Sequence, residues 1–254
     1  MLRMFGGRAT AVKIVDYVMN IRKPEPTIAR LLVKDICDRD PRLLLIEDTI
    51  ELVQTGYDAR QLLETDFVVF DLETTGAKAP PCRVTEVGAF RVHGGQITER
   101  FHTLVNPEIP IPAFITSLTG INDQMVKNAP LFADIADDLL EFLGDSVLVA
   151  HNAPFDMRFL NHEISLVFGE YRLLNPCLCT VQLSRKLLPH IENHKLKTVA
   201  EHYSISLVNH HRASDDAKAT AEIFVNLLEM LTSSGVRDIG SIKQMGLRRG
   251  AYVG

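Results

Sequence analysis

Cysteine is scarce in this sequence: its 254 residues include four cysteines, and no two of them form a C-x-x-C pair. This pattern argues against a disulfide framework and against a structural zinc site, and it is typical of a protein in a reducing compartment. Long apolar runs are also missing, because no stretch approaches the roughly 18 consecutive apolar residues of a membrane helix. We therefore expect a soluble, cytoplasmic protein with no membrane contact.

The sequence also lacks an excess of positive charge. Asp and Glu number 32 against 27 Lys and Arg, which gives a formal net charge of −5. Binding of nucleic acid by bulk charge depends on Lys and Arg that neutralise phosphates, so the total argues against that mode. It is compatible with phosphate chemistry at a carboxylate site, because bound cations offset the negative charge of such a site.

The first quarter of the chain has a helical pattern, over residues 11–64. Its clearest segment begins at Asp40, which can cap a helix that has Pro41 at its first position, and ends at Gly56. This pattern predicts a small all-helical N-terminal unit over residues 1–65, whose role the sequence leaves open.

The period changes from helical to strand-like at Asp66. Phe67-Val68-Val69-Phe70 is a short apolar run typical of a buried central strand. Two further strands, 86–92 and 97–105, are joined by His93-Gly94-Gly95-Gln96, where paired glycines fit a tight hairpin. Three antiparallel strands are therefore expected at the start of this region.

Helices and strands alternate through the rest of the chain. The pattern predicts a helix over 130–143, a buried strand over 147–150, and then, in order, a helix over 154–167, a short strand over 177–180 and helices over 181–188, 196–203 and 213–231. We expect an α/β domain over residues 66–232, followed by a short tail over 233–254.

Two acids close the first strand, in Asp71-Leu72-Glu73. Because strand side chains alternate between faces, the two carboxylates project to one side while Leu72 turns into the core. Such a pair at the end of a buried strand is costly unless it is protonated or matched by cations, and hard divalent metals are the usual partners. The alternative is an acidic turn before Thr74-Thr75-Gly76.

A third acid follows the strand at 147–150, in His151-Asn152-Ala153-Pro154-Phe155-Asp156. Pro154 lies near the start of the next helix, so Asp156 falls in its first turn, at the sheet edge where ligand sites of α/β proteins form. The alternative is an acid that only complements the helix dipole.

The fourth acid comes with an ambiguity, because His210/Asp215 and His211/Asp216 have the same separation. The following helix carries a stripe of small and apolar residues that would let it approach the sheet near Asp216; these are Ala213, Ala217, Ala221, Phe224 and Leu228. We therefore choose His211 and Asp216. His211 is expected in the loop that enters the helix, since five residues on a helix are about 140° apart.

Three motifs together resemble those of the DEDD exonucleases of the histidine subtype: Asp71-Leu72-Glu73-Thr74-Thr75-Gly76, His151-Asn152-Ala153-x-Phe155-Asp156 and His211-x-Ala213-x-x-Asp216-Ala217. More narrowly, the region 66–232 looks like the exonuclease domain of the epsilon proofreading subunit of bacterial DNA polymerase III and its free-standing relatives. The resemblance implies a ribonuclease H-like fold, with a mixed five-stranded sheet of three antiparallel strands and then parallel strands, flanked by helices.

The resemblance also implies a mechanism, hydrolysis from a 3′ end with two divalent ions, Mg²⁺ or Mn²⁺. Asp71 would bridge the ions, Glu73 and Asp216 would complete the shell of the first, and Asp156 would hold the second. His211 would accept a proton from the attacking water, and the nearby carboxylates are expected to raise its pKa.

The same resemblance places further residues around the terminal nucleotide: Thr74, Thr75, Leu118, Gly120, Ile121, Asn152 and Phe155. Leu118 and Ile121 would form an apolar floor, and core packing is the alternative for both. Basic residues, Arg212 among them, would either follow the backbone of the nucleic acid or form a solvated face.

Three functions are compatible with these motifs. The first is a DNA 3′→5′ exonuclease in proofreading or repair, which acts on a single-stranded 3′ end and has a DNA polymerase or another replication protein as partner. The second is an exoribonuclease that trims RNA 3′ ends, because discrimination between the sugars depends on contacts to one hydroxyl group. The third is a non-catalytic binding module, which the intact catalytic positions disfavour.

Overall fold

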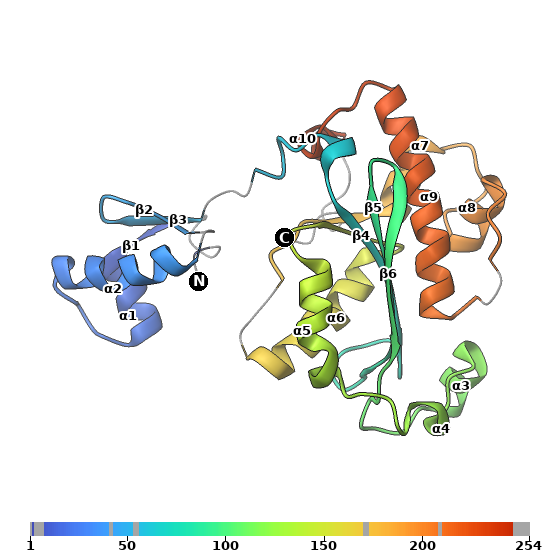
Figure 1. The fold of residues 1–254 in the computed structure, drawn as a ribbon, viewed down its shortest axis with the longest axis horizontal. Coiled ribbons are helices and arrows are strands. Elements are labelled where there is room, and N and C mark those ends of the chain that lie inside the picture. The colour runs from blue at the N-terminus through green and yellow to red at the C-terminus, as the bar shows by residue number, and fades with distance from the viewer. Residues whose placement is uncertain are drawn as a thin grey trace. The chain divides into compact units, whose positions relative to one another are not determined.

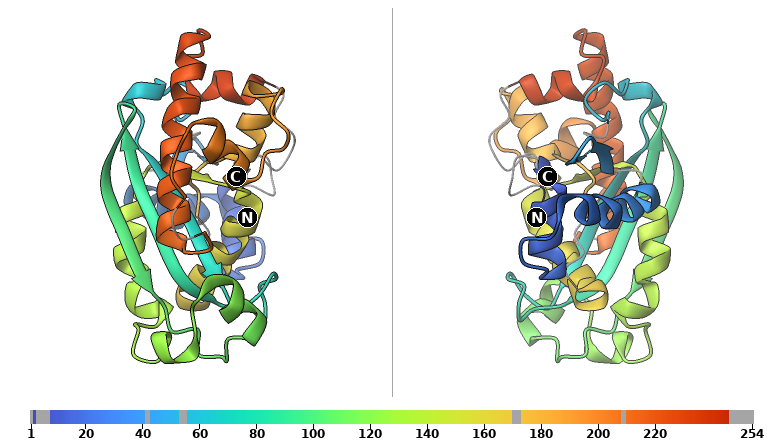
Figure 2. Two further views of the ribbon diagram at one scale, coloured as in Figure 1. Left: turned by 90° about the vertical axis from the view of Figure 1, so that its right-hand side faces the viewer. Right: turned by 90° about the vertical axis from the view of Figure 1, so that its left-hand side faces the viewer.

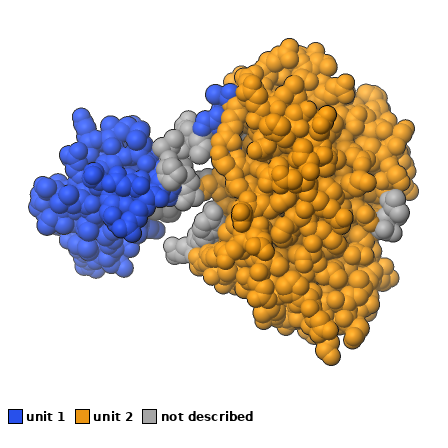
Figure 3. All heavy atoms as spheres, viewed as in Figure 1, with its two compact units in different colours: residues 1–59 blue, residues 60–254 orange. Residues whose placement is uncertain are grey.

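The computed structural model describes residues 2, 8–40, 43–52, 56–169, 173–207 and 210–245. The chain divides into two compact units, residues 1–59 and residues 60–254 (Figure 3). Each unit has a hydrophobic core of its own.

The first unit contains two helices and a small sheet. Along the chain it has β1 (Arg8–Thr10), α1 (Ala11–Met19), α2 (Pro26–Arg39), β2 (Leu43–Ile46) and β3 (Thr49–Leu52), and its antiparallel sheet has the order β1-β3-β2. Side chains cap both helices: Thr10 Oγ1 accepts a hydrogen bond from the backbone N–H of Lys13, and a Glu25 carboxylate oxygen accepts one from Ile28. Val15, Ala29, Val33 and Ile50 are buried between the helices and the sheet.

The prediction of an all-helical unit is therefore wrong. Residues 43–52, expected within a helix that begins at Asp40-Pro41, form a β-hairpin, and Asp40 follows the end of α2. Glu47, with φ 53°, lies in the turn of this hairpin. Burial alternates along β2 with the period of a strand, and the short apolar runs on either side of the turn resembled a helical spacing only when they were read as one segment.

The second unit is built on a five-stranded mixed sheet, as the resemblance implied. Its strands are β4 (Phe67–Thr74), β5 (Val84–His93), β6 (Gln96–Leu104), β7 (Val147–Ala150) and β8 (Cys177–Cys179), in the order β6-β5-β4-β7-β8. The first three are antiparallel, and β7 and β8 run parallel to β4. Gly94 and Gly95 form the predicted tight turn, with φ of +58° and +76°.

Helices cover both faces of this sheet (Figures 1 and 2). On one face lie α5 (Phe132–Leu143) and α6 (Ala153–Phe168), which pack on Phe70 and Leu72 of β4. On the other face lie α7 (Thr180–Leu187), α8 (Leu196–His202) and the long helix α9 (Ala213–Ser233). The ring of Phe224 in α9 contacts that of Phe67 at 4.8 Å between centroids, so alternate residues of β4 face opposite helical layers.

Two short helices, α3 (Ala113–Thr119) and α4 (Asp123–Val126), lie beyond one end of the sheet (Figure 1). The 3₁₀ helix η2 (Leu62–Glu64) precedes the sheet, and α10 (Ile239–Gln244) follows α9. Ile239 and Ile242 are fully buried, so the expectation of a simple tail after residue 232 is wrong for this part of it. Within the described ranges, no helix combines the length and the apolar character needed to cross a bilayer.

Candidate active site

The end of β4 presents two acids on one face of the sheet. Phe67 and Val69 of β4 are buried on the α9 side, and the alternation of the strand continues with Asp71 and Glu73 on that side while Leu72 joins the opposite core. Both acids are partly buried. The sequence placed this pair correctly, and the structure shows it under the N-terminal end of α9.

Asp156 approaches the pair from the neighbouring element. It lies in the first turn of α6, directly after β7, and is 2% exposed. Its Oδ1 accepts a hydrogen bond of 3.3 Å from the backbone N–H of Leu72, between the two acids of β4. The pairing of β7 with β4 and the helix that follows β7 therefore bring a third acid to this edge of the sheet.

Asp216 comes from α9, and a glycine makes its approach possible. Gly88 of β5 pairs with Asp71, and a Cβ atom at Gly88 would lie 2.4 Å from the carbonyl oxygen of Ala213. The absence of a side chain lets the first turn of α9 rest on the sheet. The predicted stripe of α9 is confirmed as its packing face, since its five residues are all buried: Ala213, Ala217, Ala221, Phe224 and Leu228.

Carboxylates from separate parts of the chain thus converge. One oxygen each of Asp71, Glu73 and Asp216 lie within 4.8 Å of one another. Such a group of hard oxygen donors has the chemistry that Mg²⁺ and Mn²⁺ prefer. Asp156 lies outside that group but next to it, and it contributes to the raised pKa of Asp71.

Burial and mutual repulsion hold these acids toward their protonated form. Burial, then the charges of Asp156 and Glu73, raise the pKa of Asp71 well above its usual range. Burial, then the charges of Asp216 and Glu86, raise the pKa of Glu73 to about 8, and burial raises that of Asp156 to about 8. A shared divalent cation would offset this repulsion, so the electrostatics of the site fit a metal centre.

Both candidate histidines lie beside Asp216. His210 Nδ1 is 3.1 Å from Asp216 Oδ2, whereas His211 donates its backbone N–H to the same oxygen at 3.1 Å. Their rings stack with centroids 3.9 Å apart, and each ring offers a nitrogen within 4.8 Å of Asp216. His211 lies in the loop before α9, as predicted, with φ 69°. The structure therefore supports a histidine at this place without deciding between the two.

The predicted direction of the pKa of His211 is wrong. Burial, followed by the neighbouring His210, lowers this pKa below its ordinary value, and Asp216 acts in the opposite direction. A lowered pKa keeps the ring neutral at neutral pH, which is the state that a proton acceptor needs.

The candidate nucleotide-binding residues of the first two motifs lie next to these acids in the chain, at the end of β4 and the start of α6. The Thr74 hydroxyl donates to the carbonyl of Gly76 at 2.7 Å, and the Thr75 hydroxyl accepts from the N–H of Arg83 at 3.0 Å, so both shape the turn after β4. Asn152 is exposed, has φ 74°, and its side chain does not cap α6. Phe155 is partly buried against the main core, with its ring 5.0 Å from that of Phe159.

The third candidate segment is only partly available to a ligand. Leu118 in α3 is 42% exposed, and Gly120 ends this helix with φ 73°. Ile121 is fully buried with Ile111 and Val126 in a small core. The prediction that Ile121 forms an apolar floor together with Leu118 is therefore wrong, because the side chain of Ile121 belongs to this small core.

Sequence reasoning missed a further acid in the same region, Glu86 of β5. Glu86 is fully buried, pairs with Glu73 across the sheet, and accepts hydrogen bonds from Arg212 at 2.8 and 3.1 Å. Burial opposes its ionisation, yet hydrogen bonds from Arg212, His102 and Ala213 lower the pKa of Glu86. The signal available in the sequence was the single acid of this strand, directly before the segment Val87-Gly88-Ala89-Phe90.

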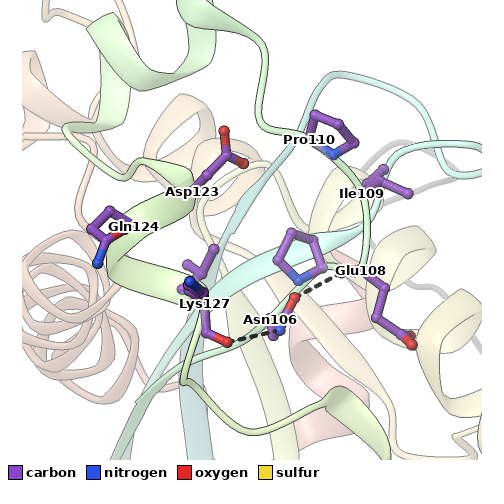
Figure 4. Close-up of a pocket in the computed structure, with 9 residues that line it drawn as sticks. Asn106, Glu108, Ile109, Pro110, Asp123, Gln124 and Lys127 are labelled. Carbon is purple, nitrogen blue, oxygen red and sulfur yellow. Dashed lines mark hydrogen bonds between the residues drawn. The ribbon is translucent and has the colours of Figure 1, made fainter.

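A hollow of about 440 Å³ lies near α4 (Figure 4). It is lined by the loop 106–110 and by residues of 123–127. Asn106 braces its wall, since its side chain accepts from the N–H of Glu108 at 3.0 Å and donates to the carbonyl of Lys127 at 3.3 Å. None of the predicted catalytic residues borders this hollow, so the acidic group, and not the hollow, is the candidate active site.

Comparison with known proteins assigns a family to this constellation. The model of the RNase_T exonuclease family matches residues 68–224, a region that contains all four acids and both histidines. The chain belongs to this exonuclease family. The matched domain is related to the epsilon subunit of DNA polymerase III.

Two curated relatives illustrate the relationship. The chain is 42% identical over 205 residues to DNA polymerase III PolC-type of Caldanaerobacter subterraneus subsp. tengcongensis, a match that covers 81% of the chain and 14% of that protein. It is 40% identical over 185 residues to DNA polymerase III subunit epsilon of Aquifex aeolicus, covering 72% of the chain and 91% of that protein. The chain thus spans about one-seventh of the length of the PolC-type relative.

Solved structures of exonucleases share the fold. Exonuclease X in complex with 5′ overhanging duplex DNA aligns with a TM-score of 0.56 at 25% identity, over 71% of this chain and 99% of that one. The nuclease domain of 3′hExo, described as a DEDDh family member bound to rAMP, aligns with a TM-score of 0.57 at 20% identity, over 69% of this chain and 94% of that one. The mixed five-stranded α/β fold of residues 66–232 and the relationship to the exonucleases and the epsilon subunit, both predicted from the motifs, are confirmed.

Proposed function

We propose that the exonuclease domain hydrolyses DNA from the 3′ end by a two-metal mechanism. The observation that supports this most directly is the convergence of Asp71, Glu73 and Asp216 within 4.8 Å, with Asp156 beside them. The relatives at 40% and 42% identity carry names of DNA polymerase III, which favours DNA over RNA as the substrate.

The four acids are the proposed ligands of two divalent ions, Mg²⁺ or Mn²⁺. Asp71, Glu73 and Asp216 would hold one ion, and Asp156 together with Asp71 would hold the other. When bound, such ions activate water and stabilise the charge on the attacking and leaving oxygens of a phosphodiester. Their binding would also release protons from the acids, because the pKa values of Glu73 and Asp156 are raised to about 8.

The remaining residues would bind the substrate and move one proton. His211 is the proposed acceptor of the proton from the attacking water, and the lowered pKa of its ring favours this role. Asn152 has a side-chain amide available for the sugar or the phosphate. Leu118 and Phe155 would contact the terminal base without reading its identity, since every base has an apolar face.

A degradation assay tests this function. The protein is incubated with a 5′-labelled single strand in Mg²⁺ or Mn²⁺, and a ladder that shortens from the 3′ end is expected. An inverted 3′-terminal nucleotide should block the reaction, and EDTA should abolish it. Asp71→Asn should reduce kcat by about 1,000-fold or more, because it removes a ligand of both ions. Cleavage that survives EDTA or this substitution would contradict the proposal.

Matched DNA and RNA strands decide the substrate. Faster digestion of DNA supports the proposal, whereas faster digestion of RNA makes the chain an exoribonuclease with the same chemistry. We further propose a DNA polymerase or another replication protein as the partner. Comigration of the full chain with a purified polymerase of its own cell in gel filtration is the expected result, and separate elution would contradict it.

A further inference from the structure

Glu86 is a buried acid whose two oxygens are fully occupied by donors. Its Oε1 accepts from Arg212 Nη2 at 2.8 Å and from His102 Nε2 at 2.7 Å. Its Oε2 accepts from Arg212 Nε at 3.1 Å and from the backbone N–H of Ala213 at 2.9 Å. The carboxylate therefore has four donors, two of them in the paired geometry that fixes both the distance and the plane of an arginine.

The donors of Arg212 and Ala213 belong to the segment that carries the catalytic candidates of the third motif. Arg212 and Ala213 directly follow His211, and Ala213 is the first residue of α9. Asp216 lies in the first turn of the same helix. One side chain of β5 thus ties the loop and the helix start to the sheet, and His102 of β6 secures that side chain from the next strand.

Glu86 stands opposite Glu73 in the pairing of β4 and β5. It shares this face with the acids of the site, but it is not part of the group suited to a cation, which consists of Asp71, Glu73 and Asp216. Arg212, named earlier as a residue that would either follow nucleic acid or lie in a solvated face, is held by Glu86 instead.

We propose that Glu86 is a positioning residue for the hydrolysis, because it holds the His211–Ala213 segment against the sheet and so sets the place of the proton acceptor. The inference rests on the proposed function. A displacement of about 1 Å in a catalytic group can lower a rate by about 100-fold. Loss of this tether should therefore lower kcat while the metal ligands of β4 stay in place.

The chain contains a second tether of the same construction, which supplies a matched control. Glu163 of α6 is 1% exposed and accepts from Arg83 Nε and Nη2 at 2.9 Å each and from the backbone N–H of Val84 at 2.9 Å. This second tether holds the turn after β4, where the N–H of Arg83 bonds to Thr75 at 3.0 Å. It has the same buried charge and the same paired arginine, but it does not hold His211.

The experiment compares Glu86→Gln with Glu163→Gln in the full chain. Each substitution replaces one carboxylate oxygen with an NH2 group, which cannot accept a hydrogen bond from arginine. We expect Glu86→Gln to lower kcat by about 10- to 100-fold with KM changed by less than about 3-fold. Glu163→Gln should mainly raise KM, because its arginine supports the turn that carries Thr74 and Thr75. Binding of Mn²⁺, measured by calorimetry, should stay within about 3-fold of the wild type in Glu86→Gln.

Three results would overturn the proposal: an unchanged kcat in Glu86→Gln, an equal loss of kcat in both variants, or a loss of Mn²⁺ binding in Glu86→Gln. If Glu86→Gln does not fold by circular dichroism, Arg212→Lys replaces it, since lysine keeps the charge but not the paired contact. A lower kcat with a preserved KM in Arg212→Lys supports the tether, and an unchanged kcat refutes it.

Failure of the proposed function is distinguishable, because it appears in the wild-type protein as absence of metal-dependent cleavage. In that case, hydrogen exchange of the Ala213 amide still tests the tether. Glu86→Gln should accelerate this exchange by about 10-fold or more, since the amide loses a charged acceptor and the paired contact with Arg212 is broken, while Glu163→Gln should leave it unchanged. Equal exchange in the two variants would refute the tether without reference to activity.

Discussion

At the scale of single residues, the carboxylates of the site repel one another in the metal-free protein. Four acids meet in a partly buried region, and their pKa values are raised. Because a cation relieves this repulsion, folding, proton binding and metal binding are linked in this protein. The sequence identified these acids by their spacing, but only their common burial determines how strongly they repel one another.

The stability of the metal-free protein should fall as the pH rises. The pKa values of Glu73 and Asp156 are about 8 in the folded state against ordinary values of 4.5 and 3.8, so the folded state binds more protons than the unfolded state. Between pH 6.5 and 8 in EDTA, the free energy of unfolding should therefore decrease, by about 3 kcal/mol. Urea unfolding measures this change, and added Mg²⁺ should restore the stability at pH 8.

The chosen pH window isolates the acids. Burial lowers the pKa of His151 to about 4, so this histidine makes the protein less stable as the pH falls below its ordinary value of 6.5. Above pH 6.5 both the folded and the unfolded protein hold His151 mainly in its neutral form, so this histidine adds little to the change in stability there. Glu73→Gln should flatten the pH dependence by removing one of the titrating acids, and a stability that rises with pH in EDTA would contradict the assignment.

Substitution of each neighbouring histidine in turn should distinguish the proton acceptor from the residue that only contacts Asp216. His211→Ala is expected to lower kcat by about 100- to 10,000-fold, the usual contribution of a proton acceptor. His210→Ala removes the contact with Asp216 at 3.1 Å and should lower kcat by less than about 10-fold. Initial rates at saturating Mg²⁺ measure both. The reverse order would assign the role to His210.

At the scale of secondary-structure elements, the site depends on how closely α9 approaches β5. The small residues of α9 were predicted from their spacing, but the matching glycine on the sheet was not. A glycine inside a strand has several explanations, and only the contact of Gly88 with the first turn of α9 shows which one applies.

Gly88→Ala should disturb the site through this contact. Its Cβ would lie 2.4 Å from backbone atoms of Ala213, so the helix start has to move away from the sheet. We expect a loss of about 1–3 kcal/mol in the free energy of unfolding, together with a lower kcat. Gly56→Ala is the control, because nothing lies within 4 Å of a Cβ atom there. Equal stability of the two variants would refute the close approach.

The hairpin of the first unit shows where reading by element fails. Helical periodicity was assigned across residues 43–52, although two strands of four residues each lie there. Segments this short contain too few positions to separate a period of 2 from one of 3.6, and the pairing of β3 with the distant strand β1 cannot be seen locally.

At the scale of the whole molecule, the contacts favour a boundary between residues 59 and 60. Arg60 and Leu62 belong to the second unit, because the carbonyl of Arg60 accepts from the N–H of Ile239 at 3.2 Å and the N–H of Leu62 donates to the carbonyl of Arg237 at 2.8 Å. Backbone hydrogen bonds therefore join the start of the second unit to the segment that follows α9.

A fragment of residues 60–254 should accordingly fold and retain the catalytic acids. We expect its kcat on a short single strand to lie within about 3-fold of that of the full chain, because its core is complete without the first unit. A fragment of residues 66–232, the domain boundaries expected from the sequence, should be less stable because it lacks Leu62 and α10. Thermal unfolding and initial rates compare the two, and equal stability would contradict the role of these contacts.

The sequence by itself determined the strands of the exonuclease domain, the hairpin glycines and the acidic motifs, because alternation, turn chemistry and spacing are properties of neighbouring residues. The tertiary structure decided the fold of the first unit, the burial of Ile121, the tether formed by Glu86 and the closeness of both histidines to Asp216. Each of these depends on contacts between residues far apart in the chain, and such contacts leave no periodic signal in either segment alone.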